Sequence, residues 1–113
     1  TWQQGLLQIF EAVQKNKPFI LNVYRCVHRE QVEKYLTPLV DDLLLGVIQE
    51  ESVGMAVRDE DKQFIAQIYS YILIGVMLDW IKDDMREEPS LLVERLARLM
   101  TGSMAAALSR FKL

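Results

Sequence analysis

Residues 59–100 read DEDKQFIAQIYSYILIGVMLDWIKDDMREEPSLLVERLARLM, and this stretch decides the fold. From Phe64 to Ile81 it is apolar on almost every face of a helix. A surface helix of a soluble protein has one apolar stripe, so a helix that is apolar all round must be covered on more than one side. A chain of 113 residues has few other helices that could cover it. We therefore predict that the helix packs against its own domain on one face and against a second copy on another.

Helical periodicity also dominates the rest of the chain. It predicts helices over residues 2–14, 18–27, 30–51, 59–86 and 89–111. Pro38 falls inside the third of these, which either kinks there or is divided in two. The predicted fold class is all-α, a bundle of about five helices. We expect its last two helices to form an intermolecular four-helix bundle with the same pair of a second copy.

Two faces can be distinguished on the long helix by turning it about 100° per residue. The face expected to pack in the core carries Ile65, Ile68, Tyr69, Ile72, Val76 and Trp80. The other face starts with small residues, which suit the close approach of another helix; it carries Ala66, Ser70, Ile74, Met77 and Ile81. Gly75 costs up to about 1 kcal/mol of helix stability relative to Ala, which suggests tight backbone contact or a ligand there.

The last helix has a wide apolar face of its own, which favours a dimer over the alternative of a buried central helix in a monomeric bundle. The predicted dimer interface combines the small-residue face with that of the last helix. Its residues are Ser70, Ile74, Met77, Ile81, Leu92, Leu96, Leu99, Ser103 and Ala107.

Composition excludes several classes of protein. The length allows one domain, and the net charge of −3 argues against this segment itself binding nucleic acid, which normally needs a basic face. A single Cys forms no internal disulfide framework and fits a reducing cytoplasm. The longest apolar run, residues 71–78, is too short to span a bilayer, so no membrane association is predicted. The chain begins with Thr1, which suggests a domain of a longer protein.

Residues that could carry catalysis do not converge in the sequence pattern. Cys26 and His28 are two apart and diverge by about 200° on a helix, so they cannot form a nucleophile–base pair. Asp79 and Asp83 share a helical face, but no His or further carboxylate stands near them to complete a metal site. No phosphate-binding loop or hydrolase motif occurs. We predict no catalytic residue, no metal, no cofactor and no enzymatic activity.

Residues that could line a ligand pocket are more numerous than residues that could carry catalysis. Tyr24, Met55 and Tyr69 are the candidates for an effector cavity among the second, third and fourth helices. They offer two hydroxyl groups and a thioether around an apolar volume, and no buried Arg or Lys is predicted to neutralise a phosphate. A small neutral effector is therefore expected. The alternative, that these side chains simply fill the core, stays open.

The order of motifs resembles the C-terminal domain of TetR-type transcriptional regulators, and among them the dihydroxyacetone kinase regulator branch. The resemblance rests on residues 64–66, 69–70 and 75–81, on Pro89, and on residues 92–93 and 96–100. It implies a helical effector-binding and dimerisation domain in the cytoplasm. It also implies an N-terminal helix-turn-helix domain, absent from this chain, through which alone DNA is bound.

The resemblance further implies control by a bound effector or, in the dihydroxyacetone branch, by a protein partner. The functional prediction is thus a ligand-responsive dimerisation domain of a bacterial transcriptional regulator. Its first expected partner is a second copy of the same chain, in a homodimer. The alternative is a free-standing helical adaptor without a DNA function.

Overall fold

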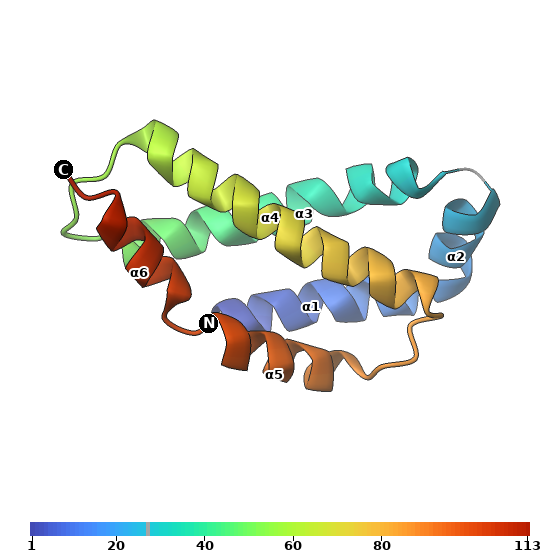
Figure 1. Ribbon diagram of the computed structural model, residues 1–113. Helices are drawn as coiled ribbons and strands as arrows, with labels where there is room; N and C mark the ends of the chain where they lie inside the picture. Colours follow the sequence, from blue (N-terminus) through green and yellow to red (C-terminus); the bar gives the residue numbers. More distant parts are fainter. Residues whose placement is uncertain (27) are drawn as a thin grey trace.

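In the computed structural model, residues 1–26 and 28–113 are described, and this part of the chain forms six helices and no strand (Figure 1). Val27, the predicted last residue of the second helix, lies outside the described residues. The helices are α1 (Trp2–Lys15), α2 (Lys17–Cys26), α3 (Arg29–Glu51), α4 (Asp59–Lys82), α5 (Pro89–Met100) and α6 (Ser103–Arg110). The all-α prediction is confirmed.

The central helix α4 starts as the sequence predicts and ends earlier. Its first turn is acidic, which complements the positive end of the helix dipole. Beyond Lys82, Asp84 and Met85 adopt left-handed backbone angles, with φ of 67° and 56°. The amide of Met85 donates to the carbonyl of Trp80 at 2.8 Å, so the last turn is closed by the chain folding back on itself. The predicted end at Arg86 was therefore wrong.

The predicted last helix is divided in two. Gly102 has a φ of 81° and separates α5 from α6. Left-handed glycines commonly end helices, because they lack the Cβ that makes this conformation costly. By contrast α3 runs without interruption through Pro38, whose side chain is exposed.

The helices are arranged around a long antiparallel pair of α3 and α4, which has the most extensive contact in the molecule. Helix α1 packs on α3, α5 packs mainly on α1, and α2 closes one end against α3 and α4. Helix α6 lies at the other end, also against α3 and α4 (Figure 1). The result is an elongated body with extents of 47, 26 and 16 Å.

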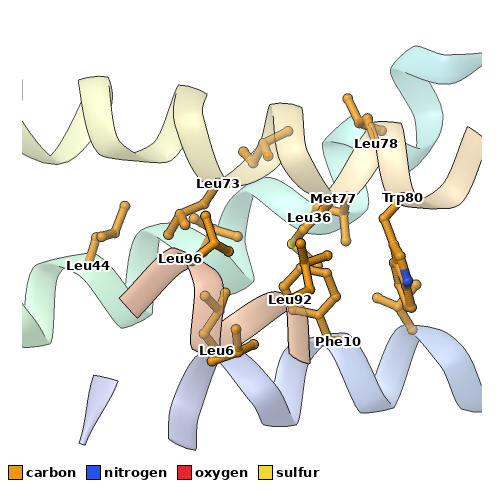
Figure 2. Close-up of a cluster of buried hydrophobic side chains, with 14 of the residues drawn as sticks. Leu6, Phe10, Leu36, Leu44, Leu73, Met77, Leu78, Trp80, Leu92 and Leu96 are labelled. Atoms are coloured by element: carbon orange, nitrogen blue, oxygen red, sulfur yellow. The ribbon is translucent and has the colours of Figure 1, made fainter. Parts of the chain in front are cut away.

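The core lies between α1, α3, α4 and α5 (Figure 2). Trp80 is only 4% exposed, which confirms its predicted place in the core. Its ring meets Phe10 of α1 edge-to-face, with ring centroids 4.9 Å apart. Its Nε1 donates to the carbonyl of Glu87 at 2.8 Å, so the indole also fastens the turn that follows α4.

Candidate effector cavity and outer surface of α4

The two faces of α4 are not covered as the sequence predicted. Every residue of the small-residue face is buried within the chain: Ala66, Ser70, Ile74, Met77 and Ile81. Ala66 and Ser70 line, with Thr37 and Asp41, a groove between α3 and α4. Small residues do mark the close approach of a helix here, but that helix is α3 of the same chain. On the face predicted to be buried, Ile65 and Trp80 are buried, whereas Ile68 and Ile72 are exposed, so the assignment was wrong for these last two residues.

Most of the predicted dimer interface is thereby placed inside the chain. Ser70, Ile74, Met77, Ile81, Leu92 and Leu96 are all buried. Ser103 and Ala107 are half-buried, and only Leu99 is strongly exposed, at 77%. The buried face of α5 packs on α1, which a pattern of apolar residues cannot distinguish from packing on a second copy.

A second apolar surface lies on the side of α4 that faces solvent. Its members are Phe64, Ile68, Tyr71 and Ile72, with exposures of 53%, 40%, 62% and 42%. Gly75 continues the same line, because it follows Ile68 by seven residues as Tyr71 follows Phe64. We call these five residues the outer stripe. A spacing of three and four along a helix is the pattern that packs against another helix.

The groove between α3 and α4 borders the outer stripe. It has a volume of about 520 Å³ and is lined by residues of both helices, including Leu45 of α3 and Phe64 and Tyr71 of the stripe. Leu45 is itself 43% exposed. Leu45 thus adds an exposed apolar side chain on the α3 side of a groove whose lining also includes the polar residues Asp41, Glu60 and Gln63.

A cavity with a volume of about 50 Å³ lies where α1, α3, α4 and α6 meet. Its apolar walls come from all four helices and from the end of α5. The lining residues are Trp2, Leu43, Leu44, Val47, Glu51, Tyr69, Leu73, Met100, Gly102, Met104 and Ala105. A buried water needs about 10–15 Å³, so this space holds roughly four water-sized groups.

Only one of the three predicted pocket residues reaches this cavity. Tyr69 lines it, as expected from its inward position on α4. Tyr24 on α2 and Met55 after α3 are half-buried and pack against the core. The sequence reasoning missed α6 as a wall because it predicted one continuous last helix; Gly102 was the signal that could have revealed the break.

Tyr69 is a polar residue of the lining, and it is paired with Ser103, which lies in the chain between the lining residues Gly102 and Met104. The Tyr69 hydroxyl and Ser103 Oγ are 2.7 Å apart, which joins α4 to α6. Ser103 Oγ also donates to the carbonyl of Met100 at 2.8 Å. Since a serine hydroxyl has one hydrogen, Tyr69 is the donor in its contact with Ser103, and its oxygen is left as an acceptor. Glu51, in the last turn of α3, is the charged residue of the lining.

No catalytic arrangement is assembled from the residues considered above. Cys26 is exposed and lies 3.3 Å from Asn22 Oδ1, and His28 is an exposed residue at the start of α3. Among residues 1–26 and 28–113, no three His, Cys, Asp or Glu side chains gather in a way that could hold a metal ion. Asp84, which follows α4, pairs with Arg25 of α2 at 2.8 Å.

Helix α4 is long and apolar enough to cross a membrane by length and composition alone. Half of its apolar window is buried inside the chain, however, as in the core helix of a water-soluble domain. Helix α4 packs against α2, α3 and α6, and its Trp80 also meets Phe10 of α1.

Comparison with known proteins identifies the family of this chain. Residues 1–102 match the model of a TetR-type family described as the transcriptional regulator C-terminal region. No curated protein and no solved structure matches the chain. The match covers α1 to α5 and ends at Gly102, just before α6. The chain therefore belongs to the family of C-terminal regions of TetR-type transcriptional regulators.

Proposed function

We propose that this chain is the ligand-responsive dimerisation domain of a TetR-type regulator that acts in the bacterial cytoplasm. Its first partner is a second copy of itself. DNA is contacted by an N-terminal helix-turn-helix domain outside these residues. The family match favours this function over a free-standing adaptor. The narrower likeness to the dihydroxyacetone kinase regulators, with control by a protein partner, rests on the residue pattern alone.

The observation that carries the proposal is the outer stripe of α4. Ile68 and Ile72 are large aliphatic side chains that the described part of the chain leaves about 40% exposed, beside an exposed Phe64. Contiguous apolar surface of this kind marks an interaction site, because leaving it in water costs about 25 cal/mol per Å². Leu99 of α5 is the one predicted interface residue that is strongly exposed, and we include it in the proposed interface.

Gly75 supports the same surface. A Cβ atom built at Gly75 meets nothing within 4 Å. The chain itself thus gives no reason for a glycine that weakens the middle of α4. A second helix approaching along the outer stripe supplies one, because glycine lets two helix backbones come close. In a symmetric dimer the two α4 helices then cross at this point.

Regulation follows from the two surfaces together. A symmetric pair of these domains sets the spacing of two DNA-binding heads, which must match half-sites on the operator. Helix α4 presents the outer stripe to the partner and Tyr69 to the cavity. A ligand that favours one position of α4 and α6 therefore shifts the population between arrangements of the pair.

The substitution Ile68→Arg tests the dimer. It places a charge in the proposed interface, while the side chain stays partly solvated in the monomer. We expect the wild type to have the mass of a dimer in light scattering at micromolar concentration, and the variant that of a monomer. Circular dichroism should show the same helix content in both.

Val53→Arg is the matched control. Val53 is 80% exposed in the turn after α3, outside the outer stripe, so this variant should remain a dimer. A wild-type chain that is monomeric at micromolar concentration, or an Ile68→Arg variant that still dimerises, would overturn the proposed interface.

A further inference from the structure

We infer that the cavity between α3, α4 and α6 binds a small aliphatic ammonium ion, with its charged end at Glu51 and its alkyl tail among the leucines. The inference rests on the proposed ligand-responsive function and names the class of ligand. It revises the neutral effector expected from the sequence, because the position of Glu51 at the cavity emerges only in the folded chain.

The charged wall of the cavity has no counterion within the described residues. Glu51 takes part in none of the four ion pairs found there. No Lys or Arg of the described chain lines the cavity. Glu51 is exposed and also lines the cavity, so a ligand can reach it from solvent.

The helix ends around the cavity also bear on the sign of the charge that a ligand must carry. Glu51 is the last residue of α3, whose final turn contains no basic side chain. The end of a helix carries about half a negative charge, and its beginning about half a positive charge. Helix α6 begins at the cavity, with an N-cap, Gly102, that offers no capping side chain. The two half charges offset one another, so the full charge of Glu51 prevails and favours a cation.

The other groups of the lining suit such a cation. The Tyr69 oxygen accepts hydrogen bonds, because its proton is committed to Ser103. Trp2 and Tyr69 are aromatic, and aromatic rings attract cations to their faces. Leu43, Leu44 and Leu73 supply apolar surface for a short alkyl tail. The volume of about 50 Å³ admits an ion of roughly four or five heavy atoms.

Helix α6 supplies part of the cavity wall. Met104 and Ala105 form one wall, and both lie beyond residues 1–102, the part matched by the family. The site therefore does not follow from the family match alone. Tyr69 links α4 to α6. A ligand bound in the cavity therefore acts on the position of α4, the helix that carries the outer stripe.

Three four-carbon probes test the charge of the ligand: n-butylammonium, 1-butanol and butyrate. We expect calorimetry or NMR titration of the whole chain to show binding of n-butylammonium. A charge-assisted hydrogen bond at a partly solvated site favours it over 1-butanol by about tenfold. Its affinity should fall as salt is added, because Glu51 is exposed. Butyrate binding as well as n-butylammonium, or no binding of n-butylammonium, would overturn the inference.

Glu51→Gln should remove the tenfold preference for the ammonium ion and leave 1-butanol binding unchanged. Glu50→Gln is the control, because Glu50 is an exposed neighbour that does not line the cavity. Ala105→Leu should fill the cavity and abolish binding of every probe, whereas Ala106→Leu, on the exposed side of α6, should not. Equal binding to Glu51→Gln and wild type overturns the site.

Light scattering on the same samples separates this inference from the proposed function. A dimer that binds no n-butylammonium overturns the ligand class and leaves the dimerisation proposal intact. A monomer that binds it with dependence on Glu51 overturns the dimer and supports the site.

Discussion

The inner and outer faces of α4 are both apolar, yet they differ in what covers them. The inner face, with Leu73, Met77 and Trp80, is buried by the other helices of the chain. The large side chains of the outer stripe are left about half exposed to solvent. Small residues occur on both faces, Ala66 and Ser70 inside and Gly75 outside. Apolar character therefore indicates how much of a helix must be covered, whereas it does not indicate whether the covering helix belongs to the same chain.

The largest expected effect comes from placing an arginine on the inner face of α4, for comparison with Ile68→Arg on the outer stripe. Met77 is fully buried, so Met77→Arg forces an unpaired charge into the core. We expect a loss of more than about 4 kcal/mol of unfolding free energy, enough to abolish cooperative folding. The sequence alone assigned Met77 to the dimer interface, and from that position the same variant would be expected to split the dimer without unfolding it. Circular dichroism and thermal unfolding decide between the two: a folded monomer would contradict the inner position of Met77.

Trp80 tests the inner face at a finer scale. Trp80→Ala should lower the unfolding free energy by about 3–5 kcal/mol, because it leaves a cavity beside Phe10. Trp80→Phe keeps an aromatic ring but loses the bond from Nε1 to the Glu87 carbonyl, and should cost roughly 1–2 kcal/mol. Urea unfolding measures both.

Tyr71→Ala is the counterpart of Trp80→Ala on the outer face. Tyr71 is 62% exposed, and its truncation should change monomer stability by less than about 0.5 kcal/mol. Comparable losses at Trp80 and Tyr71 in dilute, monomeric protein would contradict the division of α4 into two faces.

Much of the fold could be predicted from periodicity and from helix-ending residues. Pro18 and Pro89 stand at the starts of α2 and α5, where a proline is tolerated because its missing amide has no partner in the first turn. The prediction failed at Gly102, because a lone glycine is compatible with either a continuing helix or a left-handed end, and φ decides between them.

The candidate site was harder to predict because it is a tertiary feature. Tyr69 was found from its inward place on the long helix. Glu51 looked like a solvated residue at a helix end, and only the packing of α6 on α3 and α4 makes it part of a cavity wall. The burial of Ser70 and Ile74 against the chain likewise depends on which helices are neighbours, a question that hydrophobic period alone leaves undecided.

A last pair of variants separates the contribution of the outer stripe to dimerisation from the stability of the helix that carries it. Gly75 in α4 and Gly46 in α3 both lie within helices, and a Cβ built at either meets nothing within 4 Å. Replacing either by Ala should stabilise the monomer by up to about 1 kcal/mol, since Ala favours the helix. Gly75→Ala should in addition weaken dimerisation, because the added methyl group keeps the partner helix from approaching closely, whereas Gly46→Ala should leave it unchanged. Sedimentation equilibrium gives the association constant, and urea unfolding at low concentration gives the stability of the monomer. If Gly75→Ala dimerises as tightly as Gly46→Ala, the two α4 helices do not meet at Gly75, and the interface lies elsewhere along the exposed residues of α4 and Leu99.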